Sequence, residues 1–316
     1  MLKKKRTNEE KLERVFKKNE RKMKKGKASY FGTMIDPKSF HPSQIKFYLV
    51  VIPILLITLL PILFIVSHAF KPLDELYAYP PKFFATRATL DNFRNLITAT
   101  SQTGITFGRY IFNSIIVTVA VIVLSLLLSS LAAYSFTYLE FKGKQFLFAA
   151  NQFAIMFIAV AVAVPRFMVI SALGINNTYF AHIIPLLAMP VGVFLLKQFM
   201  EGIPKELNEA AIIDGANKFQ VYWHITLPMV KPALATVAIL AFQQVWNNTE
   251  TSSLFITDEA LKTLPYYFGS LSFGTSSIAV QGISAASSLI IFLPNIILFI
   301  VLQNKVMNTM AHSGIK

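Results

Sequence analysis

The stretch EAAIIDGANKFQVYWHITLP, residues 209–228, lies between two long apolar runs of a 316-residue chain and cannot itself cross a membrane. Seven charged side chains stand within it or just before it: Lys197, Glu201, Lys205, Glu206, Glu209, Asp214 and Lys218. At roughly 2.5 kcal/mol or more for each charge at the centre of a bilayer, burying even five would cost more than about 12 kcal/mol. The stretch is therefore predicted to be an aqueous loop on one side of a membrane protein.

Two short helices are predicted in this loop. Pro204 suits a first helical position, and residues 205–214 contain no helix breaker. Four residues share one side of that helix: Leu207, Ala210, Ala211 and Asp214. The two alanines leave this side shallow, so another surface can approach closely. Gly215 is placed to end the helix in a left-handed conformation. A second amphipathic piece is expected to run to Leu227 and to stop at Pro228.

The same residues resemble the cytoplasmic signature of binding-protein-dependent ABC importer permeases, EAAxxDGAxxxxxxxxIxLP. All nine fixed positions are filled: Glu209, Ala210, Ala211, Asp214, Gly215, Ala216, Ile225, Leu227 and Pro228. The resemblance implies a coupling helix, which docks in a cleft of a separate ATPase subunit and transmits its closure to the membrane helices. The alternative is an amphipathic linker between spans that matches the signature by chance.

Composition indicates a membrane protein. Hydrophobic residues make up 54% and charged residues 15%, and several mostly apolar runs exceed eighteen residues. The net charge of +14 does not indicate nucleic-acid binding, because half of the 30 Lys and Arg residues precede residue 47. Such a tail is expected to lie against anionic lipid, and binding of RNA or a regulator is the alternative. Without cysteine, the chain has no disulfide framework and no thiolate metal site.

The predicted fold is all-α, a polytopic membrane protein with six transmembrane helices at 47–69, 111–134, 146–171, 179–196, 229–248 and 285–303. The expected order is a basic tail (1–46), the first span (47–69), an extracellular connection (70–110), a core permease domain (111–305) containing the coupling loop (197–228), and a C-terminal tail (306–316). With the N-terminus inside, 23 of the 30 Lys and Arg residues fall in inner segments. Both termini and the coupling loop are therefore predicted to be cytoplasmic.

Motifs for catalysis are missing from the sequence. The only Gly-Lys pair, Gly143-Lys144, is followed by Gln145 and lacks the upstream glycine of a phosphate-binding loop. The five histidines are scattered without metal-ligand spacing, and His182 is expected to be packed and hydrogen-bonded. The chain is therefore predicted not to be an enzyme. Spans one to four and six also lack charged residues well inside the membrane, which argues against ion coupling.

Amides gather toward the outer end of the fifth span, where a substrate pathway is predicted at Gln243, Gln244, Trp246 and Asn247. Unpaired amides facing lipid are costly, so these side chains should face other helices or an aqueous cavity. Amides beside an indole suit sugar hydroxyl groups, because amides donate and accept while an aromatic face packs on C–H surfaces. The alternative is interhelical hydrogen bonding with an interfacial tryptophan anchor.

The resemblance extends beyond the loop to the carbohydrate, maltose-type importer permeases through TLDNF (89–93), Leu173-Gly174, Asn177-Thr178-Tyr179 and the HSGIK end (312–316). It implies a type I ABC importer transmembrane domain in a bacterial plasma (inner) membrane. The implied partners are a second homologous permease, two ATPase subunits that hold ATP and Mg, and an extracellular solute-binding protein that delivers a sugar or oligosaccharide. No cofactor is expected on this chain. The alternatives are a stand-alone secondary carrier or channel, an importer permease for a non-sugar solute, and an integral membrane enzyme.

Overall fold

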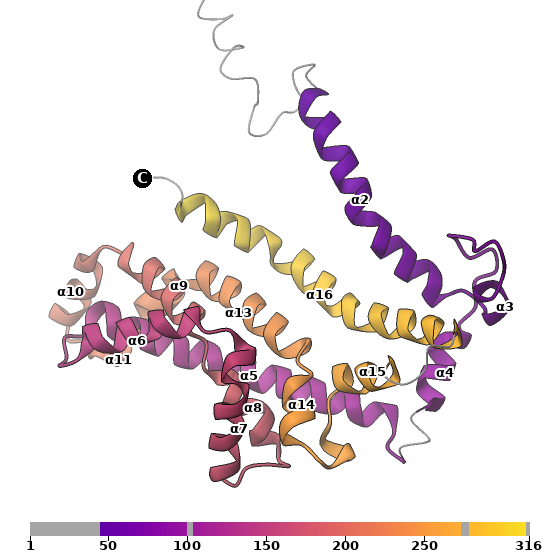
Figure 1. Ribbon diagram of the computed structural model, residues 1–316. Helices are drawn as coiled ribbons and strands as arrows, with labels where there is room; N and C mark the ends of the chain where they lie inside the picture. The colour runs from indigo at the N-terminus through magenta and orange to yellow at the C-terminus, as the bar shows by residue number, and fades with distance from the viewer. Residues whose placement is uncertain (1–44, 100–103, 273–277, 314–316) are drawn as a thin grey trace, which may run out of the picture. The chain divides into compact units, whose positions relative to one another are not determined.

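The computed structural model describes residues 45–99, 104–272 and 278–313, and every regular element in these residues is a helix (Figure 1). The all-α prediction is therefore confirmed. The chain divides into two compact units, Met1–Leu63 and Phe64–Lys316, and the second contains every helix from α3 onward. Most of the predicted basic tail and the last three residues of the HSGIK end lie outside the described residues.

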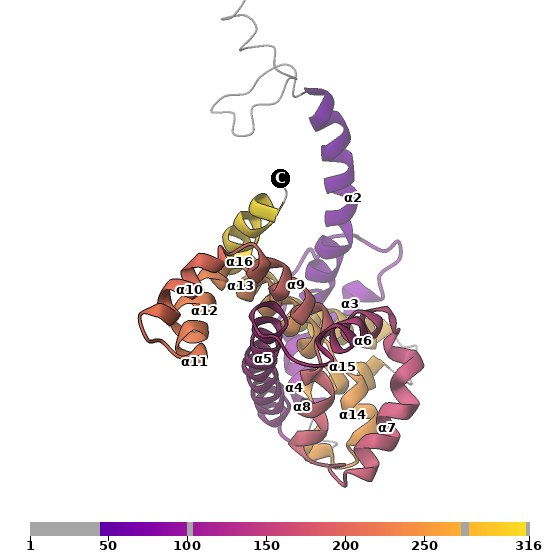
Figure 2. The ribbon, with the colours of Figure 1, turned by 90° about the vertical axis from the view of Figure 1, so that its left-hand side faces the viewer.

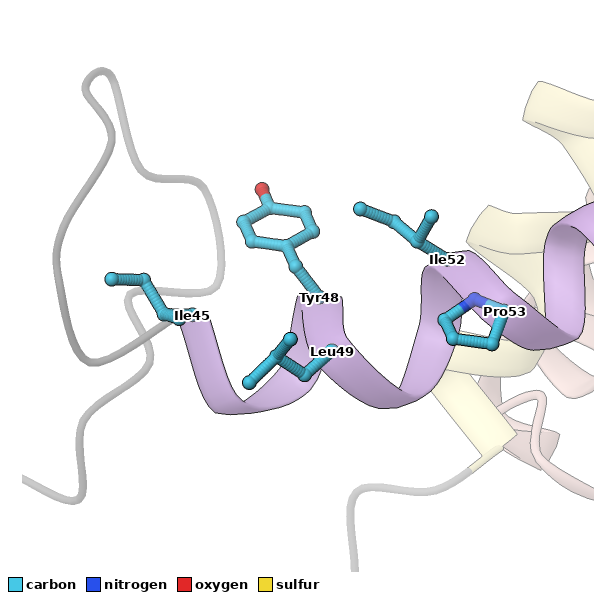
Figure 3. A pocket seen from close by; sticks show the side chains of 5 residues that line it. All are labelled: Ile45, Tyr48, Leu49, Ile52 and Pro53. Atoms are coloured by element: carbon cyan, nitrogen blue, oxygen red, sulfur yellow. The ribbon is translucent and has the colours of Figure 1, made fainter.

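The helix α2 (Ile45–Ala69) matches the first predicted span and stays helical through Pro53 and Pro61. Figure 3 shows a hollow on this helix lined by Ile45, Tyr48, Leu49, Ile52 and Pro53. All five side chains come from one stripe of a single helix. Such a stripe lacks the convergent polar groups that orient a small ligand and suits lipid tails or another helix.

Three described helices are long and apolar enough to cross a membrane: Ile45–Ala69, Phe107–Tyr138 (α5), and Val280–Gln303 within α16 (Ile278–Ser313). Three bent pairs of shorter helices raise the number to six if each pair is one span. The prediction of six spans is compatible with this arrangement. The helix α16 continues through most of the predicted C-terminal tail.

The third predicted span, 146–171, is not one straight helix. It consists of α6 (Lys144–Met156), the 3₁₀ turn η3 (Ala159–Val162) and α7 (Ala163–Ala172), and its two arms are bent by 111°. The chain leaves the helix at Phe157 and Ile158, which are extended, and Pro165 lies in the first turn of α7, because a proline deeper in a helix would clash with the carbonyl four residues earlier. A new helix therefore has to begin close to Pro165.

Proline breaks the fourth and fifth spans in the same way. Pro190 is the first residue of α9 (Pro190–Glu201), which is bent by 44° from α8 (Tyr179–Leu187). Pro232 is the second residue of α13 (Lys231–Trp246), which is bent by 80° from the helical run that precedes it. In both cases the proline occupies a first-turn position, where its missing N–H costs no intrahelical bond.

The helical run before α13 corrects one prediction. It comprises α11 (Lys218–Val221), a π-helix (Tyr222–Thr226) and α12 (Leu227–Met229). Pro228 lies inside α12, so the prediction that it stops the second amphipathic piece is wrong. The actual break is at Val230, just before Pro232, and Pro228 is accommodated in the helical turn that follows the π-helix directly.

The connections before α5 and after α13 form helices of their own. The segment before α5 contains α3 (Leu73–Leu76) and α4 (Asp91–Ala99). The segment after α13 contains α14 (Glu250–Phe255), the 3₁₀ turn η5 (Glu259–Leu261) and α15 (Leu264–Ser272). The helix α5 packs against α8, α9 and α13, and α13 also packs against α16. Two helices of the loop, α10 (Lys205–Ile213) and α11, lie together at the opposite end of α5 from α15 (Figures 1 and 2).

Candidate functional site

The helix α10 ends as the sequence predicts. Gly215 has a φ of +90°, a left-handed conformation that glycine adopts at little cost. Its N–H donates to the Ile212 carbonyl at 3.0 Å, and the Ala216 N–H donates to the Ala211 carbonyl at 2.9 Å. This pair of bonds is a Schellman motif, which satisfies carbonyl groups left free at a helix end. The predicted role of Gly215 as a helix terminator is confirmed.

The turn out of α10 leads directly into a second cap. The Asn217 side-chain oxygen accepts from the Gln220 N–H at 2.9 Å, and the Gln220 side chain accepts from the Asn217 N–H at 2.7 Å. This reciprocal capping box fixes the start of α11. The connection between the two helices is therefore defined by its own hydrogen bonds.

The outer surface of this loop is apolar and exposed. Its five large hydrophobic side chains are Leu207, Ile212, Ile213, Phe219 and Trp223, with exposed fractions from 44% to 84%. Exposed apolar patches beside charged groups commonly mark protein–protein contact sites. The surface carries charge as well, because Glu209 and Asp214 are both exposed.

The other residues of the signature fall on both sides of the loop. Ala210, Gly215 and Pro228 are exposed, whereas Ala211, Ala216, Ile225 and Leu227 are half-buried. Leu227 packs against the largest hydrophobic core, which α5, α9 and α13 build around residues such as Leu196 and Val237. The signature therefore supplies an outer surface and part of its attachment to the membrane helices.

Three tyrosines attach the loop to the membrane helices. The Tyr138 hydroxyl donates to the Met200 carbonyl at 2.7 Å, and the Tyr134 hydroxyl donates to the Lys218 carbonyl at 3.0 Å. Tyr222, which is 1% exposed, lies 2.8 Å from the Ser130 hydroxyl. We define Tyr134, Tyr138 and Tyr222 as the tyrosine base of the loop. Sequence reasoning missed this base, although tyrosines at positions i and i+4 at the end of an apolar span were a readable signal.

A cavity of about 620 Å³ lies beside the three broken spans. Its polar lining consists of four side chains: Arg166, Gln244, Asn248 and Glu250. The other lining residues include Pro165, Pro185 and Pro190, which stand at the bends of the third and fourth spans. A cavity of this size, mostly apolar with a few polar groups, has the features of a small-molecule site.

The predicted substrate-pathway residues divide between several surroundings. Gln244 lines the cavity, and Asn247 lines a second hollow of about 260 Å³. Gln243 is exposed, and its carbonyl accepts from the Asn247 side chain at 3.1 Å. Trp246 is 8% exposed and donates from Nε1 to the Ile291 carbonyl of α16 at 3.0 Å. Trp246 therefore makes the interhelical hydrogen bond of the alternative interpretation, whereas Gln244 faces the cavity, as a substrate-pathway residue should.

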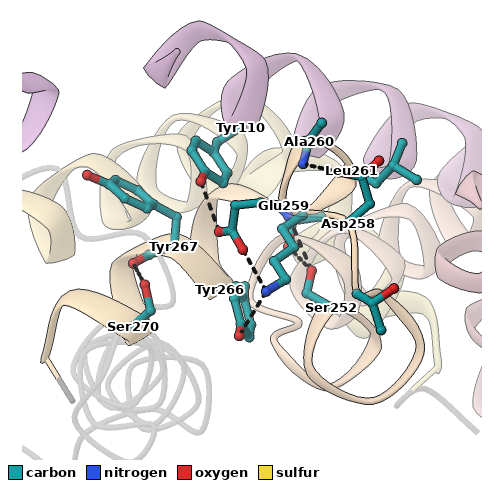
Figure 4. Close-up of polar contacts among 12 residues, drawn as sticks. Tyr110, Ser252, Asp258, Glu259, Ala260, Leu261, Tyr266, Tyr267 and Ser270 are labelled. Atoms are coloured by element: carbon teal, nitrogen blue, oxygen red, sulfur yellow. Dashed lines mark hydrogen bonds and ion pairs between the residues drawn. The ribbon is translucent and has the colours of Figure 1, made fainter. Parts of the chain in front are cut away.

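A polar cluster at the start of α5 holds the segment that follows α14 (Figure 4). Glu259 accepts from the Tyr110 hydroxyl at 3.0 Å and pairs with Lys262 at 2.7 Å. Burial opposes the charge on Lys262, but Glu259 and the Tyr266 hydroxyl outweigh it and raise the pKa of the lysine. The Asn113 amide adds bonds to the carbonyls of Ala260 and Lys262, at 2.9 and 2.8 Å. This cluster fixes the connection after α14 to α5.

The Asn177-Thr178-Tyr179 motif belongs to the same cluster. Asn177 has a φ of +60°, and its side-chain oxygen accepts from the N–H groups of Thr257 and Asp258 at 3.1 and 2.8 Å. The Tyr179 hydroxyl donates to the Asn113 side chain at 2.7 Å. These bonds give the motif a structural role at the start of α8.

His182 is fully buried, and its ring nitrogens lie 2.9 Å from the Thr251 hydroxyl and 3.1 Å from the Leu261 carbonyl. The expectation of a packed, hydrogen-bonded histidine is confirmed. No group of three His, Asp or Glu side chains in the described part of the chain is placed to hold a metal ion.

Comparison with known proteins gives concordant results. A family model described as "Binding-protein-dependent transport system inner membrane component" matches residues 144–304. The inner membrane ABC transporter permease protein YcjP of Escherichia coli (strain K12) is 31% identical over 87% of this chain and 97% of its own length. The arabinooligosaccharides transport system permease protein AraQ of Halalkalibacterium halodurans is 32% identical over 82% of this chain and 92% of its own length.

A solved structure has the same fold. It is a crystal structure of a bacterial ABC transporter involved in the import of the acidic polysaccharide alginate, and one of its chains matches with a TM-score of 0.72. The match covers 85% of this chain and 99% of that chain, at 22% sequence identity. The likeness confirms the predicted importer-permease fold over most of the chain.

Proposed function

Because this chain belongs to the family of binding-protein-dependent transport system inner membrane components, we propose that it is the permease subunit through which an ABC importer moves a sugar or oligosaccharide. The amides of Gln244 and Asn248 support a saccharide, because the Gln244 amide can donate to and accept from hydroxyl groups and the Asn248 NH2 can donate to them. The relative AraQ, named for arabinooligosaccharide transport, supports the same class of solute.

The loop around α10 is the proposed contact with an ATPase subunit. The observation that carries this proposal is the combination of an exposed apolar surface with the tyrosine base, whose hydrogen bonds join the loop to α5. An ATPase subunit that grips the exposed surface would move the membrane helices with it. ATP and Mg would be held by two such subunits, and a second homologous permease would complete the pathway.

The proposed orientation places α10 and both termini in the cytoplasm, where ATP is available. The support for this orientation is the excess of Lys and Arg in the segments on that side. The cluster around Glu259 and Lys262 would then face outward. An extracellular binding protein would deliver the solute on that face.

The test begins with the chain co-expressed with the ATPase, second permease and binding protein of its own transport system, purified and reconstituted in liposomes. Glu209→Lys reverses a charge on the exposed side of α10 and should abolish sugar uptake and sugar-stimulated ATP hydrolysis. Glu140→Lys is the control, because Glu140 is 90% exposed, lies outside the loop and loses only a surface ion pair with Lys144, which contributes little to stability. Normal uptake by a well-assembled Glu209→Lys complex would refute the docking proposal. Uptake by the purified chain alone would instead identify a stand-alone carrier.

A further inference from the structure

The charge inside the cavity is confined to one ion pair. Arg166 comes from α7 and Glu250 from the first position of α14, and they are the only charged side chains among the described residues that line the cavity. The Arg166 Nη1 atom lies 3.1 Å from one Glu250 oxygen and 3.2 Å from the other. The remaining polar lining is neutral, being the amides of Gln244 and Asn248.

This ion pair is only partly withdrawn from solvent. The side chains of Arg166 and Glu250 are 23% and 28% exposed, so a solute in the cavity can reach both. Arginine is the residue best suited to bind a carboxylate, because its planar guanidinium offers several donors in a fixed geometry. Here those donors are already directed at a carboxylate that the protein itself supplies.

We propose that the Arg166–Glu250 pair makes this cavity selective for uncharged saccharides over acidic ones. This inference rests on the proposed function and adds the chemical class of the solute. A uronic acid could bind Arg166 only by displacing Glu250, and the displaced carboxylate would then repel it. A neutral sugar does not have to break the ion pair, since its hydroxyl groups can bond to the Gln244 amide and accept from the Asn248 side-chain NH2, whose oxygen is held by the Thr251 N–H and hydroxyl.

The pair also excludes positively charged sugars by the same reasoning. An amino sugar would have to take Glu250 from Arg166 and would then face an unpaired guanidinium. Removing either member of the pair should therefore admit solutes of the opposite charge to the group that remains. A purely structural ion pair would not show this change in selectivity, because its loss would weaken the binding of all three kinds of solute alike.

The test uses the purified complex without its binding protein, so that only the membrane subunits select the solute. Isothermal titration calorimetry measures binding of arabinobiose, digalacturonate and the glucosamine disaccharide. Wild type should prefer arabinobiose. Glu250→Gln should raise the affinity for digalacturonate at least about tenfold, since a hydrogen bond between charged groups is among the stronger kinds. Arg166→Gln should raise the affinity for the glucosamine disaccharide instead.

Two controls separate charge selection from damage. The double variant Arg166→Gln/Glu250→Gln should bind all three disaccharides with similar affinity, and Glu140→Gln should bind as wild type does. Unchanged affinity ratios in both single variants would overturn the proposal, and so would wild-type binding of digalacturonate equal to that of arabinobiose. This last comparison needs no variant, so it holds even if both variants fail to assemble.

The outcome also distinguishes this inference from the proposed function. A complex that takes up sugar in liposomes but shows no charge selection retains its proposed function and loses only the selectivity. A complex that binds none of the three disaccharides without its binding protein would overturn the assignment of the cavity. The uptake assay would still report on import itself.

Discussion

Gly215→Ala is a sharp test of the loop because its cost comes from the backbone alone. Gly215 has a φ of +90°, and a Cβ added there would meet no atom within 4 Å. The substitution therefore creates no steric clash. Holding an L-residue in the left-handed region costs about 1–2 kcal/mol, which lowers the population of the Schellman-terminated loop by about 5- to 30-fold relative to competing conformations.

The assay is sugar-stimulated ATP hydrolysis by the reconstituted complex, with uptake measured in parallel. If the fixed end of α10 is needed for docking, Gly215→Ala should reduce the stimulated rate, and Gly215→Asn should reduce it less because asparagine tolerates a positive φ. The amount of the chain itself in the membrane should change little, since the substitution lies on an exposed turn.

Gly143→Ala provides a matched control. Gly143 has a φ of +86° with open space around its Cα, so the same substitution carries the same backbone cost. It lies before α6 and outside the α10 loop. Equal losses in the two variants would mean that the effect is general destabilisation. Full stimulated activity in Gly215→Ala would refute the role assigned to the fixed helix end.

Two further predictions concern other contacts. Tyr222→Phe should reduce transport and lower the free energy of unfolding by about 1 kcal/mol, because it removes the buried hydrogen bond to Ser130. A double-mutant cycle with Ser130→Ala, measured by thermal unfolding and by uptake, should show that the two substitutions are coupled. Additive losses would contradict this prediction. Hydrogen bonds from the hydroxyl and N–H of Thr86 and from the Arg87 N–H lower the pKa of Glu75 to about 2. This stabilisation should be complete above about pH 4.3 and decline as the pH falls toward 2. Proteolysis of the segment before α5 should then rise with acidity in wild type and be high and nearly pH-independent in Glu75→Gln.

The sequence was most informative where physical constraints are local. Seven charges in and before the 209–228 stretch exclude it from the bilayer, and a glycine after an unbroken helical run predicts a left-handed helix end. Both inferences depend on neighbours in the chain. Apolar runs likewise located the membrane segments, because hydropathy reports where a segment can lie.

Hydropathy did not show where those segments bend. The third, fourth and fifth spans each restart near a proline, at Pro165, Pro190 and Pro232, and these residues were visible in the sequence. Proline alone was ambiguous, however, since α2 stays helical through Pro53 and Pro61. The difference depends on neighbouring helices and side chains that re-satisfy the backbone, which a single segment does not reveal.

Contacts between polar residues far apart in the chain also could not be predicted from the sequence. The Leu264 N–H donates to the Ser114 hydroxyl at 2.8 Å across 150 residues, and Arg166 meets Glu250 across 84. Each residue alone is an ordinary polar side chain. In the structure these partners hold the connection after the fifth span as packed helices against α5 and α8.

The helix α5 is unbroken, whereas the neighbouring third, fourth and fifth spans are bent, and this difference predicts which parts of the molecule move. The 32 residues of α5 contain no proline and extend about 48 Å at 1.5 Å per residue. One end carries Tyr134 and Tyr138 of the tyrosine base, and the other carries Tyr110 and Asn113 of the polar cluster around Glu259. The three broken spans instead meet at the cavity. We therefore expect α5 to move as a rigid element while the bends open and close the cavity. On this view Tyr222→Phe should impair transport and leave disaccharide affinity unchanged, and an equal loss of both would refute it.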